Sequence, residues 1–419
     1  MEFTTIKGFK DILPEEVGSW QKLEKETRKL FECFGFQEIR MPILERNEVF
    51  SRGIGEETDI VSKEMYRLED SKGMIMTLRP EATASIVRAY IQQRLYLKNP
   101  VQKLYTIGPM FRHERPQKGR YRQFHQIDAE IFGDAGPKSD ADVILLAVRL
   151  LEAVGLPDLT LVINSLGCRQ CRAPFREKLR QYLAEKDDSL CKDCRRRAQL
   201  NPLRVFDCKL EQCRVVVAGA PSILDFLCDE CLEHFESVKQ YLSLVGVGYR
   251  IDHKLVRGLD YYARTTFEIQ TDLLGAQNAV AGGGRYDGLV RLLGGPDHPA
   301  VGFAMGMERL VALLEGNDFS EGRRPDLFIA ALGERAEKEV FKWTDMLRSA
   351  GLWAEAEYSR KGLKAQMKKA DRMGARKVLM VGEDELASGR AVLRDMATKD
   401  QEEVGLDNIS ADLIERLRS

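Results

Sequence analysis

The sequence predicts an α+β protein with a mixed, mainly antiparallel sheet, flanking helices and a separate small α/β domain at the C-terminus. Three observations support this fold class: long apolar segments pair as hairpins, βαβ units are few in the first part of the chain, and strands alternate with helices after residue 325. A chain of 419 residues is long enough for two or three domains. We therefore expect a large domain over residues 1–320, a polar linker over 314–325 and a small domain over 326–419.

The N-terminal region begins with a predicted helix, Glu15–Phe34, whose inward residues repeat at helical spacing: Val17, Trp20, Leu23, Thr27, Leu30 and Phe31. Cys33, at its end, is interpreted as a small core residue. Phe36–Leu44 alternates as a strand, and the break at Pro42 favours a sheet edge, where a second copy of the chain could dock. The glycines and acids of Ser51–Lys63 predict a mobile loop.

The other elements follow from the same patterns. A helix over Leu78–Leu95 would open at Pro80, which suits a first turn. The large domain continues with strands at Val101–Met110, Ile127–Phe132, Leu159–Asn164, Tyr249–Leu255 and Thr265–Gln270, and with helices at Ala141–Val154 and from Gly306 through Glu308. The small domain alternates strands at Leu327–Ala331, Leu352–Ala356 and Lys377–Val381 with helices at Glu334–Ser349 and Leu363–Met373.

The segment Phe111–Gln126 forms the basic tip of a predicted hairpin, with a proline break and a glycine turn. Its cations outnumber its single acid, Glu114: they are Arg112, Arg115, Lys118, Arg120 and Arg122. A solvated basic loop is the simplest interpretation of such a run. Phe124 and Gln126 on the returning strand favour a binding site instead, because arginine binds phosphate with a planar fork and a base can stack on phenylalanine.

Composition limits the classes of partner. The net charge is −1, so any attraction of nucleic acid must come from local basic patches. The contents of 44% hydrophobic and 31% charged residues are ordinary for a globular protein. No apolar segment has the form of a signal peptide or the length of a membrane span, so we expect a cytoplasmic protein without a membrane partner.

A second basic patch occupies Ser359–Lys377, where eight cations face only Asp371. Four of the cations are spaced by three and four residues and would form one stripe on a helix: Lys361, Lys364, Lys368 and Arg372. Leu363, Met367 and Ala370 would face the other way, toward a sheet. A solvated helix face is the alternative, and the charge run alone favours it.

Eight of the nine cysteines form four pairs within one segment, residues 167–236, here called the insertion because it interrupts the large domain. The pairs are Cys168/Cys171, Cys191/Cys194, Cys208/Cys213 and Cys228/Cys231. Three of them have C-x₂-C spacing, which suits two ligands of a tetrahedral zinc ion. Structural zinc and reduced, metal-free cysteines both remain open, whereas a catalytic zinc is not expected.

Six blocks resemble the histidyl-tRNA synthetases, a family of class II aminoacyl-tRNA synthetases, and they occur in family order. The basic hairpin is similar to motif 2 of that class. The other blocks are GFQEIRMPILE (35–45, motif 1), TLRPEATA (77–84), RGLDYYARTTFE (257–268), AGGGRYDGLV (281–290) and VGFAMGMERL (301–310, motif 3). The C-terminal α/β pattern resembles the anticodon-binding domain of several class II synthetases.

The resemblance implies that the large domain activates an amino acid by attack of its carboxylate on the α-phosphorus of ATP. Such a reaction needs alignment and positive charge rather than a protein nucleophile. By resemblance Arg112 binds the α-phosphate, Phe124 stacks on adenine, Arg309 binds the γ-phosphate and Glu114 lies near adenine or the metal. Arg257 would contact the reacting carboxylate and the α-phosphate, where a permanently charged fork suits two oxygens.

The same resemblance implies a histidine pocket. Glu81, Thr83 and Gln126 would hold the ammonium group. Glu130, four residues after Gln126 and on the same strand face, would accept a hydrogen bond from the imidazole; a surface acid is the alternative. The walls would be tyrosines, which could equally be core aromatics: Tyr261, Tyr262 and Tyr286. The glycine run 282–284 would permit close approach of the backbone to a ligand.

Taken with the resemblance, these residues predict an enzyme that activates L-histidine with ATP and Mg²⁺ to histidyl-adenylate and transfers it to tRNA(His), as a homodimer. The candidate tRNA contacts are Arg115, Lys118 and Arg120 together with the stripe at 361–372, and the insertion would contact the acceptor stem, apart from the activation step. A different possibility is a non-catalytic regulatory paralogue of ATP phosphoribosyltransferase. Such paralogues usually lack the C-terminal domain and lose the motifs, both of which this chain retains. The block at 257–268 disfavours a synthetase for another amino acid.

Overall fold

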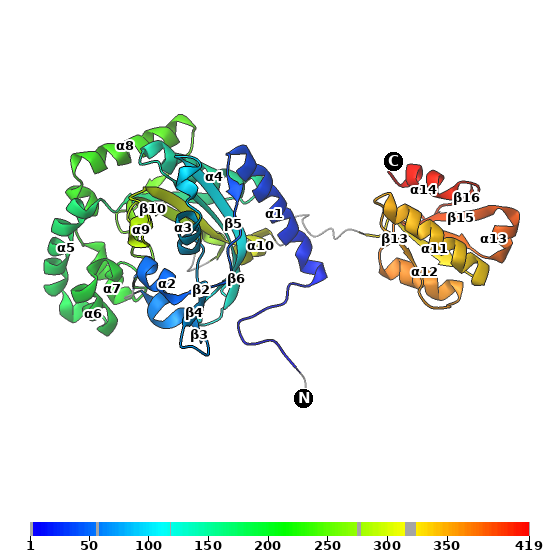
Figure 1. Ribbon diagram of the computed structural model, residues 1–419, viewed down its shortest axis with the longest axis horizontal. Coiled ribbons are helices and arrows are strands. Elements are labelled where there is room, and N and C mark those ends of the chain that lie inside the picture. Colours follow the sequence, from blue (N-terminus) through cyan, green and yellow to red (C-terminus); the bar gives the residue numbers. More distant parts are fainter. Residues whose placement is uncertain (1–2, 56–57, 118, 275–277, 315–323, 419) are drawn as a thin grey trace. The chain divides into compact units, whose positions relative to one another are not determined.

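The computed structural model describes residues 3–55, 58–117, 119–274, 278–314 and 324–418. Contacts divide the chain into two compact units, Met1–Ser320 and Glu321–Ser419 (Figure 1). Most of the expected linker, and Lys118 of the hairpin tip, lie outside the described residues. None of the helices in the described parts of the chain combines the length and apolar character that a membrane crossing requires.

The large unit is built on an eight-stranded sheet in the order β1-β5-β6-β11-β10-β9-β7-β8. The strands are β1 (Gln37–Glu38), β5 (Gln102–Phe111), β6 (Gln123–Phe132), β7 (Leu159–Ser165), β8 (Arg250–Ile251), β9 (Ala263–Thr271), β10 (Ala279–Arg285) and β11 (Ala300–Gly306). All neighbouring pairs are antiparallel except the pairs at the two edges, β1–β5 and β7–β8. The prediction of a mixed, mainly antiparallel sheet is therefore confirmed.

Helices cover both faces of this sheet. One face packs in a large apolar core against α1 (Pro14–Cys33), α4 (Pro137–Ala153), α8 (Asp229–Leu244) and α10 (Met307–Leu314). The other face packs against α3 (Thr83–Gln92) and α9 (Leu289–Leu292). Strand β6 shows why the two faces differ, because Ile127, Ala129 and Ile131 alternate into the first core and turn their polar neighbours toward the other face. That polar face is where a site can form.

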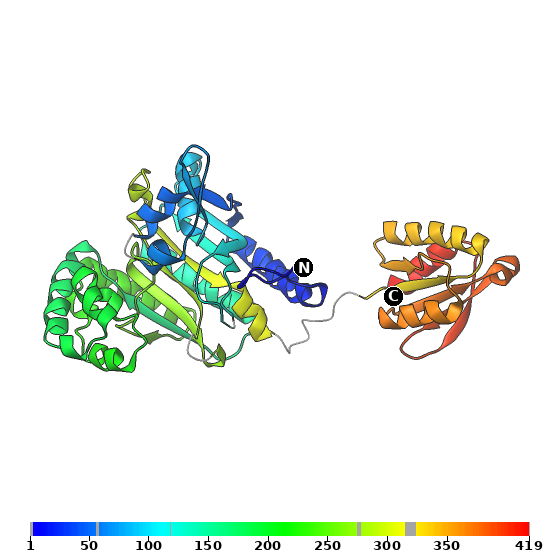
Figure 2. The same cartoon turned by 90° about the horizontal axis from the view of Figure 1, so that it is seen from below.

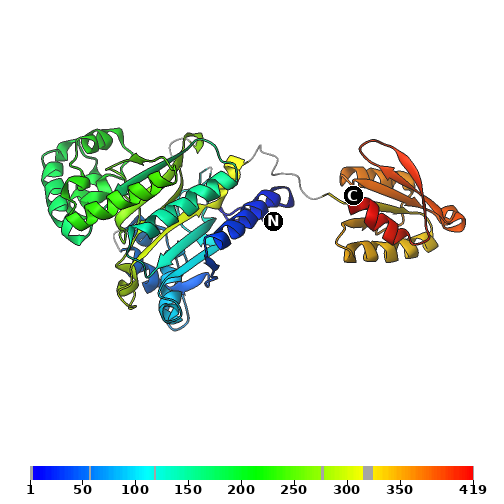
Figure 3. The same cartoon turned by 90° about the horizontal axis from the view of Figure 1, so that it is seen from above.

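The insertion forms a helical lobe at one end of the large unit (Figures 2 and 3). Its helices are α5 (Arg169–Ala184), α6 (Lys192–Leu200) and α7 (Glu211–Ala218), and α8 leads back to the sheet. It has its own small core, in which Phe175, Leu179 and Leu183 of α5 meet Cys194 and Cys213.

Several predictions near the N-terminus are wrong in ways that packing explains. Ser51–Lys63 is largely helical rather than a loop: α2 (Asn47–Ile54) and a π-helix (Ile60–Glu64) bury their apolar residues against α3. Cys33 is exposed, because α1 buries the face that ends at Phe31 and Cys33 lies off that face. That buried face, which includes Trp20 and Leu23, is otherwise as predicted.

Other boundaries also differ. The expected strand Phe36–Leu44 is two short strands, β1 at the predicted sheet edge and β2 (Leu44–Arg46), which joins β3 (Tyr66–Glu69) and β4 (Ile75–Leu78) in a small antiparallel sheet. Helix α3 starts at Thr83 rather than at Pro80, because the Glu81 carboxylate accepts hydrogen bonds from the first backbone N–H groups. Only Arg250–Ile251 of the expected strand Tyr249–Leu255 is paired.

The C-terminal unit has a five-stranded sheet in the order β13-β12-β14-β15-β16. Its elements are β12 (Leu327–Ala331), α11 (Glu334–Ser349), β13 (Ala354–Ala356), α12 (Leu363–Arg372), β14 (Lys377–Val381), α13 (Glu383–Ser388), β15 (Arg390–Asp395), β16 (Gln401–Gly405) and α14 (Ile409–Arg418). The predicted alternation up to residue 381 is confirmed. Leu363, Met367 and Ala370 of α12 pack toward the sheet, as expected.

Candidate active site

A cleft opens over the polar face of the large sheet. Its lining brings together residues from five separate sequence blocks. Eleven of the predicted site residues line it: Glu81, Thr83, Arg112, Glu114, Arg120, Phe124, Gln126, Arg257, Tyr261, Tyr262 and Arg309. A concave site lined by convergent charged, polar and aromatic side chains is typical of a ligand-binding site.

Strand β6 supplies the polar floor of this cleft. Gln126, Asp128 and Glu130 are spaced by two and so share one strand face, and all three are buried. Within the part of the chain that the structure describes, Gln126 Oε1 and both carboxyl oxygens of Asp128 have no hydrogen-bond partner. Buried polar atoms normally have one, so these atoms are suited to receive a ligand.

Asp128 was missed in the sequence, although its position halfway between two predicted residues was a sufficient signal. Burial raises its pKa well above the usual range, and the nearby carboxyls of Glu130 and Glu81 raise it further. The cleft floor therefore carries more acidic groups than predicted.

Glu130 lies beneath the lining and is 1% exposed. Thr83 Oγ1 donates to its Oε1 at 2.7 Å, and the Tyr286 hydroxyl donates to its Oε2 at 2.5 Å. Burial raises the pKa of Glu130 to about 8, although both of these hydrogen bonds act to lower it. Its neighbour in register on β11 is Gly302, where a Cβ would lie 1.6 Å from Glu130 Oε2 and 2.5 Å from the Ala129 carbonyl oxygen. Glycine is thus required opposite this carboxyl.

Glu81 has a structural role that the sequence did not indicate. Its Oε2 accepts from Thr83 N at 2.8 Å and its Oε1 accepts from Ala84 N at 2.9 Å, so it caps α3. Burial raises the pKa of Glu81 despite these bonds. A carboxylate has room for further hydrogen bonds, so a cationic ligand could still contact it.

The three predicted tyrosines form one aromatic group. Ring centroids of Tyr261 and Tyr262 are 4.7 Å apart, and those of Tyr261 and Tyr286 are 5.5 Å apart. Tyr261 and Tyr262 line the cleft, whereas Tyr286 is 1% exposed and reaches Glu130 from behind. Tyr286 and Tyr262 are thus core aromatics, Tyr262 also lines the cleft with Tyr261, and a role of the tyrosines as walls of a histidine pocket stays a prediction.

Arg257 lies beside Tyr262 and against strands β9 and β10. Its guanidinium pairs with Glu268 of β9 and lies 5.9 Å from the ring centroid of Tyr262. Gly282 of β10 is the register partner of Glu268, and a Cβ there would lie 2.5 Å from the guanidinium nitrogens. Glycine at this position therefore creates the space that the Arg257 side chain occupies. The sequence had suggested only that this glycine lets the backbone approach a ligand.

Two further arginines border the cleft. Arg112 Nε donates to the Pro80 carbonyl at 2.8 Å, and its guanidinium lies 5.1 Å from the Phe124 ring centroid. Arg309 Nη1 donates to the Ala279 carbonyl at 2.6 Å. Burial lowers the pKa of Arg309, and the neighbouring Arg120 lowers it further, which marks a concentration of positive charge. With Arg120 and Arg257, four arginines line this one cleft and can bind several anionic oxygens.

Another functional candidate that the sequence did not indicate is Glu308 of α10. Its carboxylate accepts from the backbone N–H of His125 at 2.8 and 3.0 Å and lies 3.1 Å from His125 Nδ1. It thereby fixes the start of β6 beside Phe124. The remaining acid, Glu114, pairs with Arg120 at 3.0 Å, so Arg120 faces the cleft.

The expectation that the insertion lies apart from the catalytic candidates is wrong. A second hollow adjoins the cleft, shares Arg112, Glu114 and Arg309 with it, and is lined on another side by the insertion. The insertion residues there are Arg196, Arg197, Leu200, Asn201, Arg204, Asp207 and Lys209. Arg204 Nη1 donates to the carbonyl oxygen of Arg257 at 3.0 Å. No sequence pattern indicated this contact, because it depends on how the lobe folds back onto the sheet.

The predicted tRNA-contacting residues are differently placed. Arg115 is exposed at the hairpin tip. In the C-terminal unit Lys364, Lys368 and Arg372 are exposed on α12, whereas Lys361 precedes that helix and lies 3.8 Å from Glu357. The insertion cysteines form two four-thiol groups whose spacing could hold a metal ion.

Comparisons with known proteins place these features in a family. A sequence profile described as Histidyl-tRNA synthetase matches residues 8–310, and one described as Anticodon binding domain matches residues 326–416. The Histidine--tRNA ligase of Desulfatibacillum aliphaticivorans is 57% identical over 405 residues, which are 97% of this chain and 97% of that protein.

Solved structures agree. The apo histidyl-tRNA synthetase of S. aureus aligns with a TM-score of 0.83 at 35% identity and covers 99% of this chain and 100% of its own. An ATP phosphoribosyltransferase regulatory subunit/histidyl-tRNA synthetase of Bacillus halodurans aligns over 91% of this chain and 98% of its own, with a TM-score of 0.67. Its 21% identity shows a shared fold and no more. With the ordered blocks, the cleft and these matches in agreement, the chain belongs to the histidyl-tRNA synthetase family.

Proposed function

We propose that this protein is a histidine–tRNA ligase, which joins L-histidine to ATP as histidyl-adenylate and then transfers the histidyl group to tRNA(His). One observation carries the proposal: a single cleft is lined by four arginines, and a buried carboxyl that can accept hydrogen bonds from an imidazole lies directly beneath its lining. Relatives at 57% identity bear the name Histidine--tRNA ligase over nearly their whole length. The protein is thus an ATP-dependent aminoacyl-tRNA ligase.

In this proposal the arginines bind different parts of the ATP triphosphate. Arg112 contacts the α-phosphate, and Arg309 of helix α10 contacts the γ-phosphate. Phe124, now covered by the Arg112 guanidinium, would exchange that contact for adenine, because both stack on its face. Arg257, which pairs with Glu268 in the space left by Gly282, would bridge the histidine carboxylate and the α-phosphate. Charge that develops on the phosphate during attack meets donors already in place.

The histidine side of the cleft uses β6 and the tyrosines. Glu130 accepts a hydrogen bond from an imidazole N–H, while Glu81, Thr83 and Gln126 receive the ammonium group. The unpartnered Gln126 Oε1 supports this assignment. Tyr261 and Tyr262 form the wall, and Tyr286 holds the Glu130 carboxylate in orientation. A side chain lacking the N–H leaves Glu130 unpaired, which opposes its binding.

Mg²⁺ would enter with ATP, and the cleft offers carboxylates that fit a hard cation: Glu114 and Glu308 both line it. The ion would neutralise charge on the phosphates. Glu114 would need to release Arg120, its present ion-pair partner, to join such a site.

The C-terminal unit would bind the anticodon, with the exposed cations of α12 as contacts, while Arg115 and Lys118 of the hairpin tip would meet the acceptor end. Arg120 faces the cleft, so its predicted tRNA contact would have to lie near the reacting end of the tRNA. Since tRNA charging serves translation, we place the protein in the cytoplasm.

Two copies would associate through the small sheet. Ile43, Leu44, Leu68, Met74 and Ile75 lie on or beside it and are between 38% and 47% exposed. A gathering of exposed apolar residues typically marks a protein interface. Sedimentation should give a dimer mass, and Ile75→Asp should shift it toward the monomer. A monomer at all concentrations would contradict this part of the proposal.

The decisive experiment is pyrophosphate exchange with each amino acid in turn, using the purified full-length chain. Exchange with histidine alone is expected. Exchange with another amino acid would change the substrate, and no exchange with any would favour the regulatory paralogue. The retained arginines and the complete C-terminal unit argue against that paralogue.

A further inference from the structure

The eight insertion cysteines form two groups in a nested arrangement. The first and fourth pairs along the chain make the outer cluster, Cys168, Cys171, Cys228 and Cys231, and the second and third pairs make the inner cluster, Cys191, Cys194, Cys208 and Cys213. Within each cluster all four sulfur atoms lie within 4.8 Å of one another. The outer cluster therefore joins the two ends of the insertion, and the inner cluster joins its middle.

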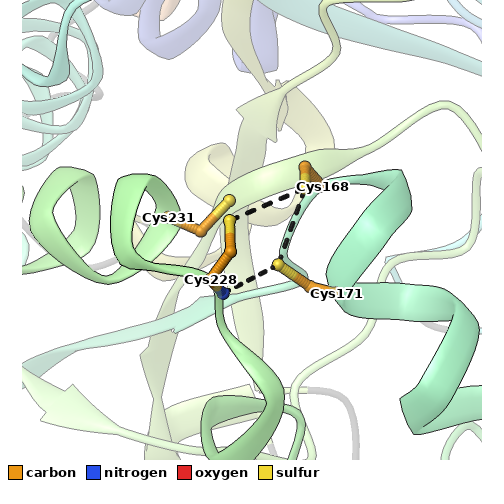
Figure 4. Close-up of side chains that lie close together, drawn as sticks. All are labelled: Cys168, Cys171, Cys228 and Cys231. Atoms are coloured by element: carbon orange, nitrogen blue, oxygen red, sulfur yellow. Dashed lines mark hydrogen bonds between the residues drawn. The ribbon is translucent and has the colours of Figure 1, made fainter.

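The sulfur geometry fits a single tetrahedral ion. In the outer cluster Cys168 Sγ lies 3.6 Å from Cys171 Sγ and 3.9 Å from Cys228 Sγ, and Figure 4 shows the four side chains converging from two helix starts. Four sulfurs bound to one zinc at about 2.3 Å are about 3.8 Å apart in a regular tetrahedron. A disulfide would need about 2.05 Å. An iron–sulfur cluster would hold its thiolates farther apart, because iron and sulfide atoms lie between them.

The backbone around the sulfurs is arranged as metal-bound thiolates require. Cys168, Cys191 and Cys228 each precede a helix, α5, α6 and α8, and their partners lie in its first turn. Backbone N–H groups point at sulfur: Cys228 N donates to Cys171 Sγ at 3.2 Å, and Cys191 N donates to Cys213 Sγ at 3.3 Å. Helix starts and such donors stabilise thiolates and orient metal ligands.

The turn into the outer cluster adds a second constraint. Gly167 has φ +59°, and a Cβ there would lie 2.6 Å from the Cys171 Cβ. Only glycine lets the chain bring Cys168 and Cys171 together in this way.

The alternative is that the thiols are small apolar side chains in a metal-free core. Cys171, Cys194, Cys213 and Cys231 are indeed at most 2% exposed. Their partners are only partly buried, however, and yet they point inward to the same centre. A helical lobe of this size has little apolar core of its own, and domains of this kind commonly depend on a metal or another cross-link.

We propose that each cluster binds one Zn²⁺ through four thiolates, and that the inner zinc fixes the insertion segment that supports the Arg257 loop. Binding converts four thiols to thiolates and releases four protons to solvent at each site, with no change of oxidation state. Two bound zinc ions per chain would complete the fold of the insertion.

The inner cluster is the one that reaches the active site. Between Cys194 and Cys208 the chain presents Asn201 and Arg204 to the Arg257 loop. Asn201 Nδ2 donates to Asp260 Oδ1 at 3.2 Å, and Arg204 bonds both Asp260 and the Arg257 carbonyl. Upstream in the same segment, Arg197 pairs with Asp59 at 3.2 Å. Arg204 is therefore a positioning residue, and this second half of the inference rests on the proposed function.

Metal content tests the first half without any use of activity. The full-length chain, purified without chelator, should carry two zinc atoms per chain by elemental analysis. Cys194→Ser and Cys231→Ser should each retain about one, while Cys33→Ser, which alters the exposed cysteine outside both clusters, should retain two. X-ray absorption should give four sulfur ligands at about 2.3 Å. Absence of zinc, iron in its place, or disulfides found by mass spectrometry would overturn the proposal.

Coupling between variants tests the second half. Cys213→Ser and Arg204→Ala should each lower the rate of histidyl-adenylate formation by about tenfold or more, as expected when a catalytic group is misplaced. In the double variant the losses should not multiply, because both act through the same contact. Multiplying losses, or full activity in a Cys213→Ser protein that has lost one zinc, would overturn this half and leave the zinc count standing. If Cys213→Ser does not fold, removal of zinc from the wild-type and Arg204→Ala proteins provides the same comparison.

Discussion

The two sides of the active-site cleft are held in place by different means. On the sheet side, Gln126, Asp128 and Glu130 are positioned by strand register, and tyrosine, threonine and glycine neighbours fix the carboxyl within this framework. On the insertion side, Arg204 lies in a single 3-10 turn (Pro202–Val205) and Asn201 directly precedes it, in the segment between Cys194 and Cys208 of the inner cluster. Strand register and its close neighbours thus position the amino-acid half, whereas on our proposal the contacts to the Arg257 loop depend on a metal cross-link within a small lobe.

Arg257 lies where the two sides meet, so its loss should have the largest effect. Arg257→Ala is expected to slow adenylate formation by about 10³-fold or more, because it removes preorganised charge at the phosphate. Single-turnover kinetics would measure this, with ATP and histidine still binding detectably.

Glu268→Gln provides the control for this change, because it removes the ion-pair partner and leaves the arginine. An unchanged chemical rate in Arg257→Ala would refute its assignment to the reacting groups.

The sequence predicted the residues on the sheet side of the cleft better than those on the insertion side. Glu130 and Gln126 were named from the resemblance, and strand alternation added that they share one face; the same alternation would have found Asp128. The ordered blocks also located Arg112, Arg257 and Arg309.

The contact of Arg204 with the Arg257 loop was not predictable, since no local pattern fixes how a lobe returns to a sheet. For the same reason the spacing gave the four cysteine pairs but not their nesting. Helix α3 began late because the Glu81 cap outweighed the preference of Pro80 for a first turn.

Removal of the C-terminal unit sharpens the comparison, because both sides of the cleft remain. A chain ending near Glu321 should keep histidine-dependent pyrophosphate exchange and lose about 10²-fold in kcat/KM for tRNA, as expected when one of two linked binding surfaces is lost. Equal tRNA affinity of the two forms would exclude an anticodon-binding role for the exposed cations of α12.

On the sheet side alone, Glu130→Gln should weaken histidine binding and spare ATP binding. At pH 9, above the raised pKa of about 8, Glu130 is ionised, and the loss of a charged acceptor is worth about 2 kcal/mol, or roughly thirtyfold in the dissociation constant. Calorimetric titration with each ligand separates the two effects. A larger loss for ATP would assign Glu130 to the phosphate half.

The raised pKa of Glu130 adds a pH dependence to the sheet side. Since its carboxyl keeps its proton up to about 8 in the folded protein but loses it near 4.5 when unfolded, its contribution to the free energy of unfolding falls as pH rises between these values. If the ionised form accepts the imidazole N–H, histidine affinity should rise roughly tenfold from pH 7 to 9, apart from the titration of histidine itself. Glu130→Gln should remove this component, and an identical profile in that variant would show that another group titrates.

The smallest effect is expected at Asp128. Its pKa is raised well above normal, which favours the protonated, uncharged carboxyl, and Asp128→Asn is nearly isosteric with that form. The change in unfolding free energy should stay below about 1 kcal/mol at pH 7, and the variant should gain relative stability as pH rises. Chemical denaturation at two pH values would measure this. A large loss at neutral pH would mean that Asp128 is ionised and balanced by a neighbouring cation.

Gly302 has a genetic consequence. Any missense change at its codon adds a carbon 1.6 Å from a carboxyl oxygen of Glu130 and 2.5 Å from a neighbouring carbonyl oxygen. A compensating change at position 130 would relieve only the first clash, because the second is with the backbone. Codon 302 should therefore tolerate synonymous substitutions alone, even in lineages where the residues around it drift.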